Sequence, residues 1–323
     1  MIVMWRCAAN ISWRRGREAR RGVHGWVILD KSLELGSTQA VAAVKRNLRQ
    51  AGFGKVKVGH GGTLDPLATG VLPIAIGEAT KLCGRMLDAS KIYAFTVAFG
   101  TETSGLDAEG EVVATSEHRP SRADVEAILA RFTGPIEQIP PAYSAIKIDG
   151  KRAYDRAHAG EVVEMKARGV IIHTLSIRQV NQAQHDEKLG ELTLTAHVSK
   201  GTYIRSLARD IARALGTVGP VTMLRRLRAG PFGEEQAISL DKLNELGQGA
   251  RPEDIILPLE AGLVDIPALD LLPEQARAIR QGRVLTGIAT EDGLYWGRDA
   301  DLRPVALVEL IDGDLKSVRG FNL

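Results

Sequence analysis

The stretch Gly59-His60-Gly61-Gly62-Thr63-Leu64-Asp65-Pro66 is the most constrained part of this chain. Three glycines within four positions let the backbone approach another group closely or adopt a positive φ. Pro66 biases Asp65 away from the helical region and fixes the direction in which the chain leaves. A tight turn capped by the aspartate would explain an isolated Asp-Pro pair, but residues 67–81 add further glycines and a proline that a simple turn does not require. We therefore expect a carboxylate at position 65 that is held in a fixed orientation.

Other kinds of catalytic or cofactor site lack their usual sequence signals. No GxxxxGK[ST] phosphate-binding loop is present and no GxGxxG string follows a predicted strand, so the common nucleotide cofactors have no anchor. The seven histidines show no HExxH or HxH spacing, and Cys7 and Cys83 form no CxxC pair. The sequence therefore favours carboxylate chemistry without a metal or a cofactor.

Length and composition indicate a folded protein, with more than one domain. The chain has 323 residues, of which 44% are hydrophobic and 25% are charged, which is enough apolar material for a full core. No apolar run approaches the roughly 18–20 residues that a membrane helix needs, and the best stretch, Val71 to Ile76, is interrupted by Pro73. Because the two cysteines give no disulfide framework, we expect a soluble protein of the reducing cytoplasm that does not bind membranes.

Charge is distributed unevenly along the chain. Residues 1–22 contain six Arg and one Glu, and we expect them to form a disordered basic arm outside the fold. Residues 200–230 contain seven Lys and Arg against the single acid Asp210, which indicates either a patch for a polyanion or an ordinary charged helix face. Residues 231–272 contain nine acids against Lys242 and Arg251, which predicts a solvated connecting region.

Hydrophobic periodicity predicts alternating strands and helices. Ser37 is expected to cap a helix that Gly52 ends, and Ser121 to begin a capping box for another helix. The large apolar residues of segment 93–99 alternate, which places Tyr93 on the apolar face of a strand. Further strands are expected at 25–29, 170–180, 191–198 and 221–228, with a helix at 203–215. Because several of these strands read as antiparallel, we predict an α+β fold with a mixed, largely antiparallel sheet and flanking helices.

The last block of the chain reads as a small module. A helix is expected over 273–281, with strands near 294–296, 305–311 and 315–318. A module of about 55–60 residues is close to the lower limit for independent stability, so we expect it to lean on its neighbour. The predicted organisation is therefore a basic arm over 1–22, a main domain over 23–263 and a small α+β or barrel-like module over 264–323.

The constrained stretch and the residues after it resemble a known family signature. The pattern Gly59-His60-x-Gly62-Thr63-Leu64-Asp65-Pro66-x-Ala68-x-Gly70-x-Leu72, continued by Gly77-x-Ala79-Thr80-Lys81, resembles that of the bacterial TruB-type tRNA pseudouridine-55 synthases. The likeness continues in the family's order through residues 91–93, 139–147, 199–205 and 224–227, and covers roughly residues 24–263. One departure is visible, because the family commonly has Lys-Pro-x-Gly where this chain has Lys31-Ser32-Leu33-Glu34.

The resemblance implies a fold, an activity and a set of catalytic residues. It implies a pseudouridine synthase catalytic fold over 23–263, a PUA-like RNA-binding module over 264–323, and isomerisation of the T-loop uridine U55 of tRNA to pseudouridine. By the same resemblance Asp65 is the catalytic carboxylate, Arg205 pairs with it and Tyr93 packs on the target base. Moving uracil from an N1 to a C5 glycosidic link involves no redox change and no group donor, so no cofactor is required. Whether Asp65 adds to the base, attacks ribose C1′ or removes a ribose proton stays open.

RNA contacts follow from the same resemblance. The target uridine has to leave its stack to reach the carboxylate, at a cost of roughly a few kcal/mol. His60 is then expected to stack in the vacated space, and Tyr203 and Leu224 to line the uracil pocket. The candidate phosphate contacts are Lys31, Lys147, Lys200, Arg225 and Arg226.

The implied partner is the T arm of tRNA, bound by a monomer that requires no protein partner. An RNA chaperone that binds the tRNA elbow without catalysis is a different interpretation, but a pure binder need not keep the set Asp65, Tyr93 and Arg205. A sister synthase that acts on other RNA with guide partners is a third interpretation, which is disfavoured because this chain lacks long basic tails.

Overall fold

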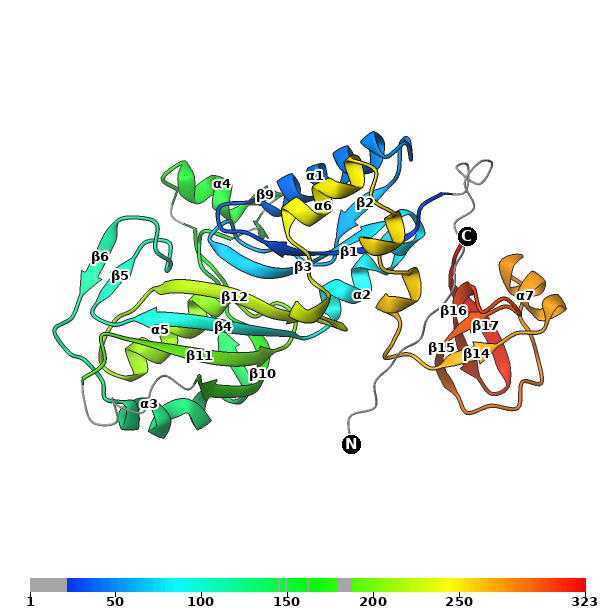
Figure 1. Ribbon diagram of the computed structural model, residues 1–323. Coiled ribbons are helices and arrows are strands. Elements are labelled where there is room, and N and C mark those ends of the chain that lie inside the picture. Colours follow the sequence, from blue (N-terminus) through cyan, green and yellow to red (C-terminus); the bar gives the residue numbers. More distant parts are fainter. Residues whose placement is uncertain (1–21, 145, 149, 162, 179–187) are drawn as a thin grey trace, which may run out of the picture.

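The computed structural model describes residues 22–323 except 145, 149, 162 and 179–187. Its centre is a nine-stranded sheet whose main path runs β1 (Gly25–Lys31), β3 (Ala68–Ile76), β12 (Val221–Ala229), β4 (Lys91–Ala98), β11 (Glu191–Val198), β10 (Arg168–Ile177) and β7 (Gly134–Gln138) (Figure 1). Two short strands join it, β2 (Val58–His60) beside β3 and β13 (Phe232–Gly233) beside β12. Of the described pairings in this sheet, β3 with β12 is parallel and the others are antiparallel. The predicted α+β fold with a mixed, largely antiparallel sheet is confirmed.

Two groups of helices pack on this sheet and build two apolar cores (Figure 1). Helices α1 (Ser37–Gln50) and α6 (Leu240–Gly247) cover β1 and β3. Helices α5 (Ile204–Ala214) and α3 (Arg122–Leu129) cover β4, β10 and β11. Tyr93 of β4 and Leu224 of β12 pack against both cores, so they mark the place where the two meet.

Short elements link these layers. They are η1 (Gly77–Leu82), α2 (Cys83–Asp88), β5 (Thr101–Thr103), β6 (Val112–Thr115), η2 (Ala130–Phe132), β8 (Lys147–Ile148), β9 (Lys151–Arg152), α4 (Ala153–His158), η3 (Glu234–Gln236), η4 (Pro252–Asp254) and η5 (Leu259–Gly262). The predicted hairpin is present as β10 and β11, and Ser121 forms its predicted capping box with Asp124.

The start of α1 differs from the prediction. Gly36 is the N-cap, and its N–H donates to Gln39 Oε1 at 2.7 Å. Ser37 is the first helical residue, and its Oγ is 3.0 Å from both the N–H and the carbonyl oxygen of Leu64. The hydroxyl therefore ties the helix to the constrained loop instead of capping it, which a local capping rule cannot detect.

Strand β3 was not predicted, because Pro73 interrupts its apolar run. The proline pairs with Ile28 of β1, and its carbonyl accepts a hydrogen bond from Gly61 at 2.8 Å. Along the edge of β3 that faces away from β1, the partner strand changes at this point. Residues 68–70 pair with β12, and residues 74–76 pair with β2. A proline at the point of change removes no ladder hydrogen bond, so a buried strand tolerates it.

The acidic region 231–272 is not the solvated connection that its charge predicted. Ile238 and Leu257 each donate a backbone hydrogen bond to β1 and accept one from it. Leu243 and Leu246 of α6 are fully buried against α1. The apolar positions between the acids decide the packing, and the carboxylates stay at the surface, so the region completes the main core.

The last block forms a second, four-stranded sheet, which contains the three predicted strands and one further strand, β14, that was not predicted. Its elements are β14 (Ala268–Asp270), α7 (Pro273–Arg280), β15 (Gly293–Arg298), β16 (Pro304–Ile311) and β17 (Asp314–Gly320). Leu307 and Phe321 pack into a core with Trp26 and Phe232 of the main sheet. Lys81 also donates to the carbonyl oxygen of Gly320 at 2.8 Å. The module therefore leans on its neighbour, as its small size requires.

Three sequence expectations concern features outside this architecture. Residues 1–21 of the predicted basic arm lie outside the described residues. Among the described helices, none has the length and apolar character needed to cross a membrane. In the described part of the chain, no group of three or more His, Cys, Asp or Glu side chains could hold a metal ion.

Candidate active site

A cavity of about 320 Å³ opens beside Tyr93 and Leu224, where the two cores meet. The loop 62–65 after β2 forms one wall, and the segment 198–205 that leads into α5 forms another. Tyr93, Leu224 and Arg226 project from the central strands β4 and β12. Segments far apart in the sequence thus converge on one pocket, and Asp65 and Arg205 both line it.

Asp65 and Arg205 form an ion pair in this cavity. Nη2 of Arg205 lies 2.8 Å from Oδ2 of Asp65. The arginine side chain is 7% exposed and the aspartate side chain is 42% exposed. The predicted partnership is therefore present in the geometry, with the carboxylate on the open side and the guanidinium behind it.

Three further contacts fix the guanidinium of Arg205. Nη1 donates to the carbonyl oxygen of Gly105 at 2.9 Å and to Oδ2 of Asp107 at 3.1 Å, and Nη2 donates to the carbonyl oxygen of Tyr143 at 2.9 Å. Burial raises the pKa of Asp107, and the Arg205 guanidinium opposes that rise. Asp107 was not predicted as a site residue, because the segment between β5 and β6 carries no recognisable motif.

Lys31 holds the chain next to the loop that carries Asp65. Its Nζ donates to the carbonyl oxygens of Ser32, Leu35 and Pro66 at 3.0, 2.7 and 3.0 Å. The residue is completely buried, and burial lowers the pKa of Lys31 to about 8, although Asp65 nearby favours the charged form. Its prediction as a phosphate contact is wrong in this structure, because all three ammonium hydrogens point to backbone oxygens.

The unusual sequence after Lys31 keeps a loop shape that normally needs glycine. Glu34 has φ 63°, in the left-handed region, and its N–H donates to the carbonyl oxygen of Pro66 at 2.9 Å. This is the position at which the TruB-type pattern has glycine. Glu34 therefore adopts a backbone conformation that favours glycine, at a cost of about 1 kcal/mol.

Arg226 also supports the loop that carries Asp65 and is not a surface cation. It is 1% exposed, and its Nε donates to the carbonyl oxygen of Val71 at 2.7 Å. Its two Nη atoms donate to the carbonyl oxygens of Thr63 and Gly62 at 3.3 and 3.2 Å. The prediction of a phosphate contact is wrong here as well, because the guanidinium is hydrogen-bonded to the loop that carries Asp65.

Arg225, the neighbour of Arg226, points to the other side of β12, as alternation in a strand requires. Its guanidinium makes two hydrogen bonds to Asp30, both at 3.0 Å, and one to Glu234 at 2.6 Å. These two carboxylates hold it away from the cavity, so the structure does not support its prediction as a phosphate contact.

Lys200 and Lys147 differ from these interior or paired cations. Lys200 lies next to the cavity-lining segment and forms an exposed ion pair with Asp88 at 2.8 Å, with both side chains about two-thirds exposed. A pair of this kind exchanges easily with another anion. Lys147 lies in β8, but its side chain is outside the described part of the structure.

The two tyrosines and the leucine predicted to surround the uracil do line the cavity. Tyr93, Tyr203 and Leu224 face it together. Gln138 Oε1 accepts a hydrogen bond from the Tyr203 N–H at 2.8 Å, and the Arg168 guanidinium carbon lies 4.7 Å from the centre of the Tyr203 ring. Arg168, which no motif indicated, reaches the cavity from the start of β10 and donates to the carbonyl oxygen of Gly201.

His60 lies just outside the cavity wall. Its Nδ1 accepts a hydrogen bond from the Gly62 N–H at 3.4 Å, and burial with help from Arg226 lowers the pKa of His60. The imidazole is therefore neutral at physiological pH.

Lys91 is a cavity residue that sequence reasoning missed. Its ammonium donates to the carbonyl oxygens of Met86, Leu87 and Ala89 at 3.0, 2.7 and 2.7 Å. Burial lowers the pKa of Lys91 to about 8. Lys91 belongs to the Lys91-Ile92-Tyr93 string of the family pattern. That string did not indicate that Lys91, as well as Tyr93, would line the cavity.

Family models match most of the main domain. The model described as "TruB family pseudouridylate synthase (N terminal domain)" matches residues 46–204. The model described as "tRNA pseudouridylate synthase B C-terminal domain" matches residues 205–264. The junction between them falls at Arg205, so the two halves of the Asp65–Arg205 pair come from different matched segments.

Curated relatives match almost the whole chain. The protein named tRNA pseudouridine synthase B of Novosphingobium aromaticivorans is 72% identical over 301 residues, which are 93% of this chain and 98% of that protein. The protein of the same name from Zymomonas mobilis is 56% identical over 300 residues, which are 93% of this chain and 96% of that protein.

Solved structures share the fold at lower identity. An H/ACA RNP bound to a substrate RNA containing 2′-deoxyuridine contains a chain that aligns with a TM-score of 0.69 and 22% identity, covering 93% of this chain and 85% of that chain. A Cbf5-Nop10-Gar1 complex contains one that aligns with a TM-score of 0.67 and 25% identity, covering 89% and 78%.

Proposed function

The chain belongs to the TruB family of pseudouridylate synthases and is a tRNA-modifying isomerase, and from that premise we propose that it converts U55 in the T loop of tRNA to pseudouridine without a cofactor, using the Asp65 carboxylate. The observation that carries the proposal is the Asp65–Arg205 ion pair at 2.8 Å in a cavity built from both cores.

The reaction is an internal transfer of one bond. The N1–C1′ bond of the uridine breaks, the base turns, and a C5–C1′ bond forms, while the hydrogen of C5 is lost and N1 gains one. Atoms and electrons balance within the nucleotide, so no donor or oxidant is needed. An ionised Asp65 can serve as a nucleophile at the base or at C1′, or as a base toward a ribose proton.

The surroundings of Asp65 suit such a carboxylate. Arg205 is fixed by two backbone carbonyls and Asp107, so it presents its guanidinium in a constant position to the acid it contacts. Because Asp65 remains 42% exposed, one oxygen stays accessible to a substrate atom. The ion pair and the position in the cavity wall support a role for this carboxylate in the reaction.

The extruded uracil would lie between the aromatic side chains. Tyr93 and Leu224 provide an apolar floor at the junction of the cores, and Tyr203, stiffened by Arg168, provides a wall. We propose that Tyr93 packs on the base and assists the loss of the C5 proton. His60, neutral and next to the loop, would fill the space that the base leaves in the RNA.

RNA phosphates would meet cations at the cavity rim. Of the candidates whose side chains are described, Lys200 is the one that the geometry leaves exchangeable, through its exposed pair with Asp88. We also propose that residues 264–323 act as a PUA-like RNA-binding module, since exposed Arg277, Arg283 and Arg319 lie on it. Lower affinity for tRNA in an Arg283→Gln/Arg319→Gln variant would support this role, and unchanged affinity would refute it.

The test of the proposed function uses tRNA labelled with tritium at C5 of uridine. Formation of the C5–C1′ bond releases that tritium, so release from wild-type enzyme should match one uridine per tRNA and vanish when U55 is replaced by cytidine. Asp65→Asn should lower the rate at least about 10³-fold, because the carboxylate acts in the chemical step. Asp301→Asn, an exposed change in the last module, should keep the wild-type rate.

Two outcomes would contradict the proposal. Release by Asp65→Asn at the rate of Asp301→Asn would remove Asp65 from the reaction. Tight binding of tRNA by the wild-type protein without any tritium release would instead favour the interpretation as an RNA chaperone.

A further inference from the structure

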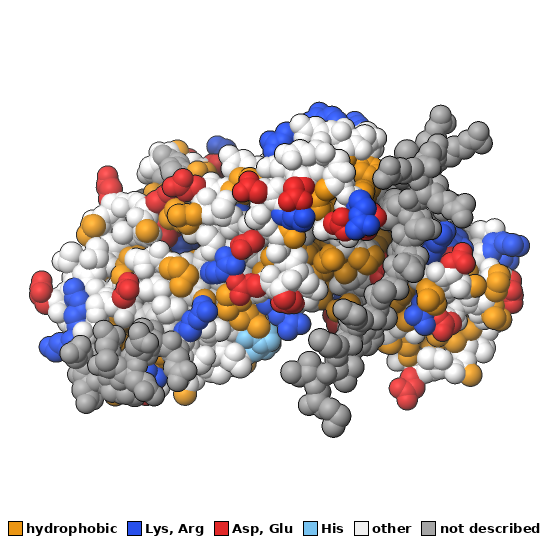
Figure 2. Space-filling view, in the orientation of Figure 1, with side chains coloured by type: hydrophobic (Ala, Val, Ile, Leu, Met, Phe, Trp, Pro, Cys, Tyr) orange, Lys and Arg blue, Asp and Glu red, His pale blue; other side chains and the backbone are white. Residues whose placement is uncertain are grey.

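A second basic surface lies away from the active site, on α1 and the segment that follows it. From Leu35 through Leu64 the chain has no acidic residue, but it has five cations, Lys45, Arg46, Arg49, Lys55 and Lys57. All five are exposed. Figure 2 shows Lys and Arg side chains gathered along the upper edge of the molecule, over the place where Figure 1 has α1.

These cations differ from those of residues 200–230, which the sequence singled out as the basic patch. There Lys200, Arg205, Arg209, Arg213 and Arg225 are all paired with carboxylates. By contrast, none of the five on and after α1 makes an ion pair with a carboxylate in the described part of the chain. The surface around α1 therefore carries a group of exposed cations that no carboxylate neutralises.

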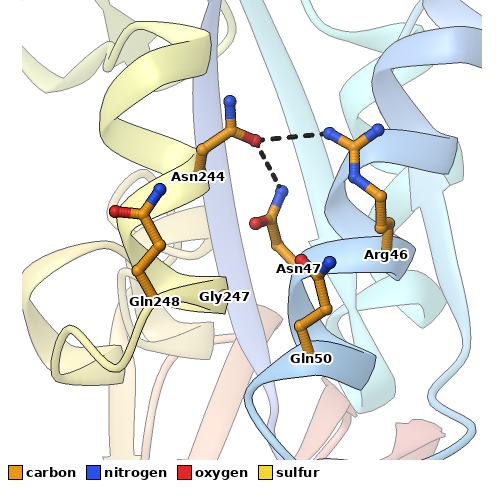
Figure 3. A pocket seen from close by; sticks show the side chains of 6 residues that line it. All are labelled: Arg46, Asn47, Gln50, Asn244, Gly247 and Gln248. Carbon is orange, nitrogen blue, oxygen red and sulfur yellow. Dashed lines mark hydrogen bonds between the residues drawn. The ribbon is translucent and has the colours of Figure 1, made fainter.

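Arg46 is the one member with a neutral partner. Its Nη2 donates to Asn244 Oδ1 at 3.3 Å, and Asn47 donates to the same oxygen at 3.0 Å, across the groove between α1 and α6 (Figure 3). This contact turns Arg46 toward α6. Lys45 and Arg49 lie on the same helix but line a different hollow from the one beside Arg46.

Lys45, Arg49 and Lys55 converge on a single hollow. They line a cavity of about 490 Å³ together with Leu48, Gly54 and Val56. Gly52 and Gly54, with φ 87° and 68°, turn the chain back after the helix, so Lys55 comes to lie across from α1. Below this basic rim lies apolar surface, and the hollow has the shape and charge to hold an anionic group.

Helix stabilisation does not account for this arrangement. A cation in the last turn of a helix interacts favourably with the helix dipole, which would explain Arg49. Lys55 lies outside the helix, however, and like charges that share a hollow repel one another unless an anion lies between them. The arrangement is what an external polyanion requires.

The hollow lies at a fixed distance from the loop that carries Asp65. Ser37 at the start of α1 is hydrogen-bonded to Leu64, which precedes Asp65. With a rise of about 1.5 Å per residue, Lys45 and Arg49 lie about 12 and 18 Å farther along the helix axis. An RNA whose loop enters the cavity extends well beyond that distance.

We propose that Lys45, Arg49 and Lys55 bind backbone phosphates of the same RNA whose uridine enters the cavity, as a second contact site on the far half of α1. The inference rests on the proposed function. It assigns to this surface affinity and positioning, with no part in the chemical step, because none of the three side chains lines the catalytic cavity.

The experiment compares two triple variants of the full chain with unmodified tRNA. Lys45→Gln/Arg49→Gln/Lys55→Gln removes the proposed contacts. Arg122→Gln/Lys242→Gln/Arg251→Gln removes the same number of charges from cations that already pair with Glu126, Glu245 and Asp254. Both triples change the net charge of the molecule equally, so long-range attraction of RNA is matched between them.

In the first triple we expect the slope of log binding constant against log salt to fall by about 2, because each phosphate contact contributes roughly 0.7–0.9. KM for tRNA should rise about tenfold with kcat unchanged, since uniform binding is lost and the chemical step is not touched. The second triple should keep the wild-type slope and KM. Thermal unfolding should change only slightly in the first triple, through the loss of the Arg49 charge at the end of α1, since all three side chains are exposed.

Equal salt slopes and equal KM values in the two triples would overturn the proposal and leave the surface to another anionic partner. A drop in kcat without a change in KM would overturn it as well, because it would show an effect on the catalytic loop. If the wild-type protein released no tritium from tRNA, the proposed function itself would fail. The two failures are distinguishable, because the comparison of variants tests only the contact site and starts from an active wild-type enzyme.

Discussion

Nη2 of Arg205 lies 2.8 Å from Oδ2 of Asp65, and the arginine is the fixed member of this pair. Its guanidinium also bonds two backbone carbonyls and Asp107 on the side away from the cavity. Asp65 has a different support, since Arg226, Lys31 and Ser37 hold the backbone of its loop. The orientation of the carboxylate is therefore set twice, through its backbone and through its partner.

Arg205→Lys should lower kcat by about 10²-fold or more while KM for tRNA changes little. One ammonium offers three hydrogens from a single atom and cannot reach Asp65, Asp107 and both carbonyls together, so the carboxylate loses its alignment. The control is Arg213→Lys on the same helix, where the side chain is 57% exposed and pairs with Glu102. Similar single-turnover rates for the two variants would show that the fork geometry of Arg205 is unimportant.

The buried ammonium of Lys31 should give stability a distinct pH dependence. Burial lowers the pKa of Lys31 from 10.5 to about 8. Between these values the unfolded chain keeps the proton and the folded protein loses it, so the contribution of Lys31 to the free energy of unfolding rises with pH through this window. The difference between wild type and Lys31→Met, from urea denaturation at pH 7.5 and 10, should grow by up to about 3 kcal/mol. A difference that shrinks with pH would contradict the buried placement.

Glu34→Gly should stabilise the protein by about 0.5–1 kcal/mol. Glutamate at φ 63° is strained, and glycine adopts this conformation freely, although the unfolded chain gains entropy that offsets part of the relief. Leu33→Gly is the matched control, because Leu33 is an exposed neighbour without a positive φ and should lose stability. Equal shifts in the midpoint of thermal unfolding for both variants would show that position 34 carries no strain.

Much of this fold follows from local sequence, and the reasons for the exceptions are physical. The hairpin of β10 and β11, the capping box at Ser121 and helix α5 were read from periodicity and capping, which act within a few residues. Strand β3 was missed because the tolerance for Pro73 depends on where β12 and β2 replace each other as partners. The role of region 231–272 was misjudged because net charge says nothing about which apolar positions reach the core.

The site shows the same division between local and long-range information. Asp65, Tyr93 and Arg205 were named from motifs, and the cavity brings them together. Motifs do not distinguish a cation that faces RNA from one that bonds backbone carbonyls, so Lys31 and Arg226 were assigned to phosphate. That distinction depends on burial, which is set by segments distant in the chain, as is the approach of Asp107 to Arg205.

Two glycine positions with similar φ should differ sharply in their tolerance of alanine. Gly70 has φ 100°, and a Cβ there would lie 2.3 Å from the carbonyl oxygen of Arg226. Gly134 has φ 94°, and no atom lies within 4 Å of a Cβ built there. Gly134→Ala should cost about 1 kcal/mol from backbone strain alone, whereas Gly70→Ala should cost more than about 3 kcal/mol, because β3 and β12 must separate. Equal losses in urea denaturation would mean that the close approach of these strands is not rigid.

Arg226→Gln and Lys200→Gln should change different properties of the enzyme, although both residues were predicted as phosphate contacts. Arg226 is 1% exposed and donates to three backbone carbonyls, two of them in the loop before Asp65. Its loss should leave these oxygens unpaired, lower the free energy of unfolding by about 2–4 kcal/mol and reduce kcat. The salt dependence of tRNA binding should stay as in wild type.

Lys200→Gln should leave stability within about 0.5 kcal/mol of wild type, because its exposed pair with Asp88 contributes little. It should instead lower the salt slope of tRNA binding by roughly 0.7–0.9, the share of one phosphate contact. Chemical denaturation and binding titrations from 50 to 300 mM salt on both variants measure the two effects. A reduced salt slope in Arg226→Gln at unchanged stability would mean that the guanidinium leaves the loop when RNA binds, and its assignment as a support of Asp65 would have to be withdrawn.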